Sequence, residues 1–193
     1  TKNHEWIKYP GVDVVDKTIG VIGAGAIGTA FVRRATGFTD KILVNDLVER
    51  DEVKAMGAKY VSKEEIYSSC DIISLHVPLD ESTFHLLDEK AFSLMKPGTI
   101  LVNTARSKCV EVEPLTKALK DGTLRGYGVD VYDFEPPAWL ELFDLPNVVM
   151  TPHVAGTTYE SNQRMGDTAV TNVIAVKQGK TPPNLITFGG ASA

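Results

Sequence analysis

A glycine-rich turn near the start of the chain constrains the fold more than any other feature. The β-branched run Ile19–Ile22 is typical of a buried strand, and it leads directly into Gly23-x-Gly25-x-x-Gly28 and a helical pattern. In this order Gly23 permits a sharp turn, Gly25 lets backbone approach a pyrophosphate, and Gly28 lets the helix lie close to the strand. The N–H groups at the helix start would face the phosphates. The turn therefore predicts a dinucleotide-binding unit.

Glycines also cluster in ordinary turns, so the motif needs supporting context. Asp46 ends the second predicted strand and lies 18 residues after Gly28, close to the spacing of about 20 expected for an acid that binds a ribose diol. The alternative explanation of Asp46 is a turn residue after a strand. Because strand, turn, helix and acid occur in the required order, dinucleotide binding is the favoured interpretation.

The rest of the chain alternates short apolar strands with helical segments. Strands are predicted at residues 19–22, 41–44, 59–61, 71–75, 99–103, 126–130 and 147–150. The helices between and after them are predicted at residues 51–56, 62–70, 87–95, 113–120 and 160–177. Strands that are apolar throughout indicate a parallel sheet covered on both faces. We predict an α/β Rossmann fold, a doubly wound parallel sheet in a single domain.

The length and composition bound the class of protein. At 193 residues one domain is the default; we assign residues 1–17 to a leading linker, 18–180 to the Rossmann domain and 181–193 to a C-terminal tail. A net charge of −5 argues against a non-specific nucleic-acid surface. The sequence contains neither a long apolar run nor a signal-peptide pattern, so we expect no membrane partner. Cys70 and Cys109 form no CxxC, which predicts reduced thiols, a cytoplasmic location and no metal site.

The residues that follow each strand are the candidates for chemistry, because ligands of such folds bind outside the carboxyl ends of the strands. These positions hold Gly23, Asp46, His76, Arg106, Asp130 and His153. Taken singly, each polar residue has a structural explanation: an arginine can pair with a carboxylate, and a lone histidine is more often structural than catalytic. Together with Glu135, they would converge on one rim of the sheet.

Six short motifs follow one another along nearly the whole chain. They are Trp6 in the leading segment, Gly23-x-Gly25-x-Ile27-Gly28, His76-Val77-Pro78, Asn103-Thr104-Ala105-Arg106, Asp130-Val131-Tyr132 with Glu135-Pro136, and Thr151-Pro152-His153. In this order they resemble the D-isomer-specific 2-hydroxyacid dehydrogenases, a family that includes the D-3-phosphoglycerate dehydrogenases. His76 is interpreted as structural.

The resemblance implies three catalytic residues. Arg106 would clamp the substrate carboxylate, for which its planar guanidinium is suited. His153 would be the acid/base, and Glu135 its partner, because a neighbouring carboxylate favours the charged imidazole and holds its tautomer. The implied reaction moves a hydride between C2 of a D-2-hydroxy acid and the nicotinamide, while His153 takes or returns the hydroxyl proton.

The resemblance also implies NAD as the cofactor. Its predicted binding residues are Gly23, Gly25, Ala26, Ile27, Gly28, Asp46, Val77, Pro78, Thr104, Ala105, Arg106, Asp130, His153, Ala155 and Gly156. Among them the pyrophosphate is assigned to Ala26 and Ile27, the adenosine end to Asp46 and Val77, and the nicotinamide end to Thr104, Ala105, Asp130 and the backbone near Ala155. The carboxylate of Asp46 would accept from both ribose hydroxyls and repel a 2′-phosphate, which predicts NAD over NADP.

Two departures from the family pattern stand out. Ser107 follows the arginine where the family usually has glycine, and Glu111-Val112-Glu113-Pro114 replaces the usual Asp-Glu pair and alanine. The family places a substrate-binding domain of about 100 residues before this segment and returns to it at the C-terminus (within the usual range of domain sizes), and we expect neither part in this sequence. We therefore expect a nucleotide-binding domain alone, with little or no turnover by itself.

The predicted function is hydride transfer between NAD and a small 2-hydroxy or 2-keto acid, with 3-phosphoglycerate or a related acid as the substrate. The alternative is an NAD-dependent binding or assembly module that resembles the C-terminal-binding corepressors. A domain binding S-adenosylmethionine is disfavoured, because it would not need Arg106, Glu135 and His153 together. A homodimer is expected, and Trp139, Leu140, Leu142 and Phe143 could supply an apolar contact or fold back on their own core.

Overall fold

The structure is a computed structural model that describes residues 11–138 and 140–186. The predictions made for Trp6 and Trp139 lie outside the described residues. The chain divides into two compact units, Thr1–Pro152 and His153–Ala193. The last helix belongs to the second unit.

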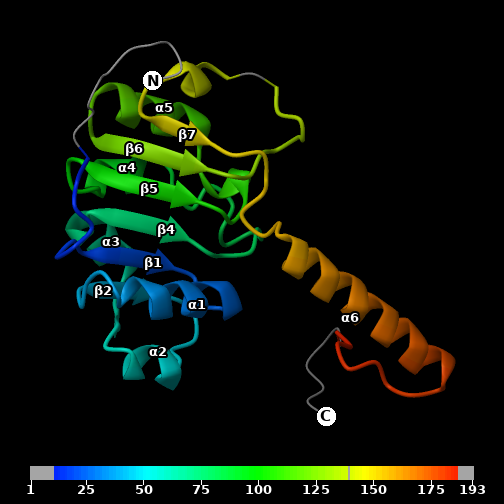
Figure 1. The fold of residues 1–193 in the computed structure, drawn as a ribbon. Helices are drawn as coiled ribbons and strands as arrows, with labels where there is room; N and C mark the ends of the chain where they lie inside the picture. Colours follow the sequence, from blue (N-terminus) through cyan, green and yellow to red (C-terminus); the bar gives the residue numbers. More distant parts are fainter. Residues whose placement is uncertain (1–10, 139, 187–193) are drawn as a thin grey trace, which may run out of the picture. The chain divides into compact units, whose positions relative to one another are not determined.

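Seven parallel strands form one sheet in the first unit (Figure 1). They are β1 (Ile19–Ile22), β2 (Ile42–Asn45), β3 (Lys59–Tyr60), β4 (Ile72–Leu75), β5 (Thr99–Asn103), β6 (Leu124–Val129) and β7 (Val148–Met150). Their order in the sheet is β3-β2-β1-β4-β5-β6-β7. The prediction of a parallel Rossmann sheet is confirmed. The direction of strand order reverses between β1 and β4, and such a switch point is where folds of this kind bind ligands.

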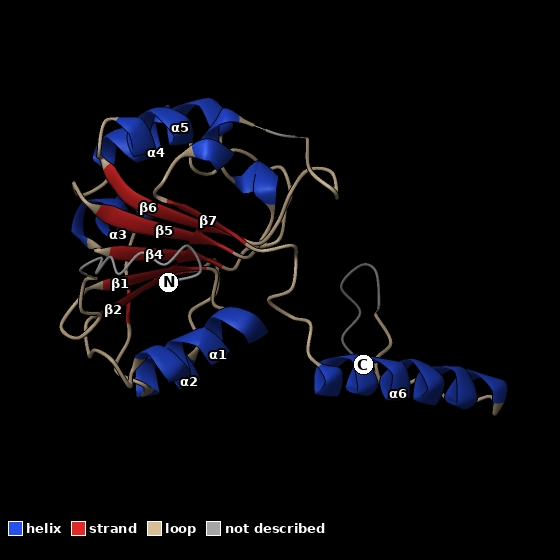
Figure 2. Cartoon of the chain, turned by 45° about the horizontal axis from the view of Figure 1, so that its top comes forward, coloured by secondary structure: helices blue, strands red, loops and turns tan. Residues whose placement is uncertain are grey.

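Five α-helices of the first unit lie on the two faces of the sheet. They are α1 (Ala26–Ala35), α2 (Asp51–Ala55), α3 (Lys63–Ser69), α4 (Glu89–Leu94) and α5 (Val112–Lys120). Two short 3-10 helices accompany them, η1 (Ser107–Cys109) and η2 (Glu141–Asp144). Figure 2 shows α4 and α5 on one side of the sheet and α1 and α2 on the other. Each side has its own buried cluster, one including Ile66, Phe92 and Leu115, the other Val32 and Val53.

Side-chain caps decide where two of these helices begin. Ser62 accepts a hydrogen bond from the N–H of Glu65 at 3.1 Å, which is half of the capping box that the sequence predicts at the start of α3. Asp88 accepts from the N–H of Ala91 at 2.8 Å and starts α4 at Glu89, two residues later than predicted. Both caps satisfy N–H groups that would otherwise lack an intrahelical partner.

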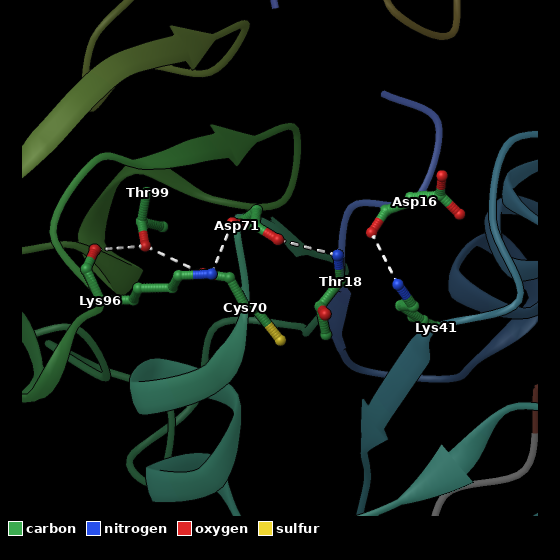
Figure 3. Close-up of polar contacts among 7 residues, drawn as sticks. All are labelled: Asp16, Thr18, Lys41, Cys70, Asp71, Lys96 and Thr99. Atoms are coloured by element: carbon green, nitrogen blue, oxygen red, sulfur yellow. Dashed lines mark hydrogen bonds and ion pairs between the residues drawn. The ribbon is translucent and has the colours of Figure 1, made fainter. Parts of the chain in front are cut away.

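A polar network joins the amino ends of the central strands, at the edge opposite the predicted site (Figure 3). Asp71 accepts from the N–H of Thr18 at 2.9 Å and from the ammonium of Lys96 at 2.7 Å. The hydroxyl of Thr99 donates to the carbonyls of Cys70 and Lys96. Burial alone raises the pKa of Asp71, but the hydrogen bonds from Lys96 and Thr18 outweigh it, so the pKa lies below its ordinary value. These contacts fasten β1, β4 and β5 to one another.

The second unit contains α6 (Tyr159–Lys177). Its start is fixed by a reciprocal pair, because the hydroxyl of Thr158 accepts from the N–H of Ser161 and the hydroxyl of Ser161 accepts from the N–H of Thr158. All of α6 is described, and none of its residues is buried. Across the described residues, the helices are all too short or too polar to cross a membrane.

Candidate functional site

The turn between β1 and α1 uses its three glycines for different reasons. Gly23 has a φ of +95°, a conformation that L side chains rarely adopt. A Cβ at Gly28 would lie 1.9 Å from the carbonyl oxygen of Gly23, so only glycine lets α1 approach the turn this closely. At Gly25, by contrast, no atom of the described residues lies within 4 Å of an added Cβ. The open side of the turn is therefore the side on which a ligand can approach the backbone.

The amino end of α1 has the properties of an anion site. Among the described residues none caps this end with its side chain, and the first turn contains no acidic residue. The side chain of Ile27, in that first turn, is 71% exposed. The N–H groups of a first helical turn have no intrahelical partner and carry a partial positive charge, which a phosphate satisfies. The residues present therefore fit a dinucleotide pyrophosphate, for which the N–H groups of Ala26 and Ile27 would be the donors.

Asp46 lies beside this turn, as the spacing predicts. One of its carboxylate oxygens accepts from the N–H of Ala24 at 2.5 Å, and the other accepts from the N–H of Val48 at 3.0 Å. The turn is also joined to the end of β2 by a hydrogen bond of 2.8 Å from the N–H of Gly23 to the carbonyl of Asn45. A carboxylate held here lies where the ribose next to a bound pyrophosphate would be.

The segment after β4 forms the other wall of the turn. A Cβ at Gly23 would meet the backbone of His76 and Val77 at 2.7–2.9 Å, so this backbone packs directly against the glycine turn. The ring of His76 lies 2.9 Å from the hydroxyl of Ser74, within hydrogen-bond distance, and 5.1 Å from the ring of Phe31. Burial lowers the pKa of His76 to about 4, so the ring is neutral near pH 7. A half-buried, neutral histidine at this position supports the wall of the turn.

The turn after β5 presents Arg106. Asn103 is fully buried; its amide oxygen accepts from the N–H of Ala105 at 3.0 Å, and its amide nitrogen donates to the carbonyl of Arg106 at 3.0 Å. The N–H of Cys109 donates to the same carbonyl at 3.2 Å. The backbone of Arg106 is thus fixed, while the residue itself is exposed. Its guanidinium donates to the carbonyl of Ala105.

The segment after β6 carries Asp130 and Glu135. Asp130 is buried and accepts from the hydroxyl of Thr151 at 2.5 Å, and its N–H donates to the carbonyl of Asn103 at 3.2 Å. The phenol of Tyr132 donates to the carbonyl of Thr151 at 2.7 Å. Burial raises the pKa of Tyr132, and the carboxylates of Asp130 and Glu135 raise it further. These contacts bring the ends of β5, β6 and β7 together.

The predicted site residues fall into two groups. In the first unit the glycine turn and Asp46 follow β1 and β2, on one side of the switch point. On the other side, after β4, β5 and β6, are Val77, Pro78, Thr104, Ala105, Arg106, Asp130 and Glu135. His153, Ala155 and Gly156 belong to the second unit. His153 has a φ of 54°, one of three positive values among the described non-glycine residues. Such backbone strain is enriched at functional sites.

Sequence reasoning assigned no role to three residues that hold the site: Ser74, Asn103 and Thr151. Asn103 ends an apolar strand and Thr151 directly follows one. Their positions close to Arg106 and His153 in the sequence were the signal that could have indicated a role in the site. Ser74 is buried in β4, and nothing in its local sequence indicates the contact with His76. Within the described residues, no group of three or more histidine, cysteine or acidic side chains could hold a metal.

The fold and this site define a dinucleotide-binding Rossmann domain. The model of the D-isomer specific 2-hydroxyacid dehydrogenase, NAD binding domain, matches residues 1–155 of the chain. The chain belongs to this family, and its cofactor is NAD.

Two relatives and one solved structure illustrate the similarity. The glyoxylate reductase of Korarchaeum cryptofilum is 44% identical over 178 residues, 91% of this chain and 54% of that protein. The glyoxylate reductase of Thermococcus onnurineus is 42% identical over 181 residues, 93% and 54% respectively. The D-lactate dehydrogenase of Aquifex aeolicus, solved with NAD and lactic acid, has a TM-score of 0.83 at 33% identity, covering 92% of this chain and 59% of that one. The chain therefore spans about half the length of the curated relatives it matches.

Proposed function

We propose that the full-length gene product is an NAD-dependent D-2-hydroxyacid dehydrogenase that acts on small 2-keto acids, with glyoxylate as the first candidate. One observation carries the proposal: a pyrophosphate cradle with Asp46 bonded to it occurs in the same sheet edge that presents Arg106. A cofactor cradle beside an exposed, fixed arginine suits a reaction between a dinucleotide and a carboxylic acid.

The relatives favour a small substrate over 3-phosphoglycerate. Those named above are two glyoxylate reductases and a D-lactate dehydrogenase. The acids in these names, glyoxylate and lactate, carry no phosphate group. The alternative of an NAD-dependent assembly module is not favoured, because these relatives are enzymes. Glyoxylate and pyruvate share a carboxylate next to a carbonyl, which is the group that a single arginine fork can orient.

The chain's own residues have three roles in the proposed reaction. When bound, NAD supplies the hydride donor or acceptor. Arg106 binds the substrate carboxylate in a bidentate manner and orients the carbonyl carbon. His153 gives a proton to the carbonyl oxygen during reduction and takes it from the hydroxyl during oxidation, and Glu135 holds the imidazole in the required tautomer. The assignment of His153 rests on the motif Thr151-Pro152-His153 and on its strained backbone.

The remaining proposed cofactor contacts follow from position along the sheet edge. Thr104, Ala105 and Asp130 lie after β5 and β6, where the nicotinamide end would extend from the pyrophosphate cradle. Val77 and Pro78 would flank the adenosine end, beside Asp46. Ala155 and Gly156 are assigned to the nicotinamide end from the sequence resemblance.

A homodimer in the cytoplasm completes the proposal. Two residues of the apolar group favour the alternative in which the loop folds back on its own core: Leu142 is 3% exposed, and the partly buried Phe143 packs edge-on against Tyr132 beside the core. Leu140 remains 38% exposed. The two cysteines are free and buried, in keeping with a reducing compartment. Light scattering on purified protein tests the assembly, and a monomeric mass would contradict it.

The activity is tested by a substrate panel. The full-length protein is mixed with NADH and, in turn, glyoxylate, pyruvate, hydroxypyruvate and 3-phosphohydroxypyruvate, and NADH loss is followed by absorbance. We expect the highest kcat/KM for one of the unphosphorylated acids. A preference for the phosphorylated acid would contradict the proposed substrate class, and no NADH loss with any acid would contradict the proposed activity.

A further inference from the structure

A hydrogen bond connects the two loops that carry Arg106 and Glu135. The hydroxyl of Ser107 donates to a carboxylate oxygen of Asp133. Ser107 directly follows Arg106 and is the first residue of η1, whereas Asp133 lies two residues before Glu135 in the loop between β6 and η2. The contact spans 26 positions of sequence. It therefore links two segments that folding brings together only at the carboxyl edge of the sheet.

The backbone at Ser107 does not require glycine. The positive φ values among the described non-glycine residues belong to Asp16, His85 and His153, so Ser107 adopts a conformation open to any L residue. Arg106 has an extended backbone, with φ −146° and ψ 142°. The serine that departs from the family pattern thus leaves the arginine turn intact and adds a hydroxyl that reaches the neighbouring loop.

The arginine turn is held by Asn103, and the Glu135 loop is exposed. Asn103 holds the arginine turn through two hydrogen bonds of 3.0 Å, one accepted from the N–H of Ala105 and one donated to the carbonyl of Arg106. The Glu135 loop is anchored at its start, where Tyr132 bonds to Thr151, and it then runs through exposed residues from Asp133 to Pro136. A hydrogen bond from a hydroxyl to a carboxylate is stronger than a neutral one. The Ser107 hydroxyl therefore ties the exposed Glu135 loop to the arginine turn.

We propose that Ser107 and Asp133 are positioning residues, a pair that sets Glu135 relative to Arg106 for the dehydrogenase reaction. The inference rests on the proposed function, in which Arg106 binds the substrate carboxylate and Glu135 supports the acid/base. Neither Ser107 nor Asp133 touches the substrate in this account. Losing their bond lets the Glu135 loop drift from the arginine while the cofactor cradle, on β1 and β2, keeps its geometry.

The kinetic test compares Ser107→Ala, Ser107→Thr, Asp133→Asn and the double variant in the full-length protein. Ser68→Ala is the control, because it removes a hydroxyl that bonds within α3, away from both loops. We expect Ser107→Ala and Asp133→Asn to raise KM for the 2-keto acid about 3- to 10-fold, the effect of one charge-assisted hydrogen bond, with KM for NADH unchanged. Ser107→Thr keeps the hydroxyl and should restore the wild-type KM.

Coupling gives the decisive kinetic result. If the two residues act through one bond, the double variant is no worse than Ser107→Ala alone. Effects that multiply, or a Ser107→Ala variant with the wild-type KM and the wild-type pH profile of kcat, would overturn the proposal. An equal change in KM for NADH would also overturn it, because it would show general damage to the site.

Hydrogen exchange separates this inference from the proposed activity. In the same proteins, peptides covering residues 131–138 should exchange faster in Ser107→Ala and Asp133→Asn than in wild type and Ser68→Ala, whether or not the protein turns over a 2-keto acid. Absence of turnover in wild type contradicts the proposed function alone. Equal exchange in all variants contradicts the positioning role.

Discussion

Gly25→Ala and Gly28→Ala should differ in their effect on the unfolding free energy. At Gly28 the new Cβ would lie 1.9 Å from the carbonyl oxygen of Gly23, whereas real Cβ contacts essentially never fall below 3.0 Å. The start of α1 must therefore move by more than about 1 Å relative to the turn, and overpacking of this kind typically costs about 1–3 kcal/mol of unfolding free energy. At Gly25 the described chain leaves open space, so the fold should hardly change.

The two variants should lose NAD affinity for different reasons. Gly25→Ala places a methyl group on the open side of the turn, between the backbone and the pyrophosphate, and we expect a loss of affinity of at least about tenfold, or 1.4 kcal/mol. Its unfolding free energy should stay within about 1 kcal/mol of wild type, because alanine at an N-cap is only modestly worse than glycine. Gly28→Ala should lose both stability and affinity.

The assay combines urea unfolding with calorimetric titration of NAD on the 193-residue chain. Gly37→Ala provides a matched control, since its Cβ would meet a backbone oxygen at 3.3 Å, outside the site. Wild-type NAD affinity in Gly25→Ala would refute the assignment of the open side to the pyrophosphate. Wild-type stability in Gly28→Ala would refute the argument from close packing.

Two further changes test other parts of the structure. Asp46→Ala should reduce the affinity for NAD more than the affinity for NADP, and titration of both cofactors measures the smaller difference. The change should also loosen the turn, because the carboxylate accepts from the N–H of Ala24. Asp71→Asn should reduce the unfolding free energy by about 1–2 kcal/mol near neutral pH. Because the folded pKa of Asp71 is depressed, this difference is fully present above the unfolded pKa of about 3.9 and is lost as the pH falls through the folded pKa. A difference that persists at the lowest pH would show that lost packing, not charge, is responsible.

Local chemistry explains why much of the fold could be predicted. The glycine turn, the Ser62 cap and the apolar strands depend on residues close together in sequence, and the structure has them where expected. Strand β1 is buried at all four residues, as a fully covered strand should be. Burial could not be predicted for every strand. The apolar sequence of β7 predicts that Val149 is buried, but its side chain is 69% exposed.

The parts that sequence could not predict depend on contacts between distant segments. Helix α6 has a clear helical pattern, but no local motif indicates that it belongs to a second unit or that none of its residues is buried. Asn103 was visible beside Arg106, but its two bonds across the turn require the folded backbone. The contact between Ser107 and Asp133 crosses from one loop to another, so its sequence signal was only an unexpected residue after the arginine.

The central claim, that Arg106 and His153 act chiefly on the substrate and its proton, is tested most directly by single-turnover mixing of the full-length protein with NADH and glyoxylate. Wild type should consume NADH in one fast phase. Arg106→Ala and His153→Ala should bind NADH with nearly wild-type affinity, read from its fluorescence in the same mixing experiment, and should lose the fast phase. A fast phase of wild-type rate in either variant, or a loss fully explained by weaker NADH binding, would contradict the account.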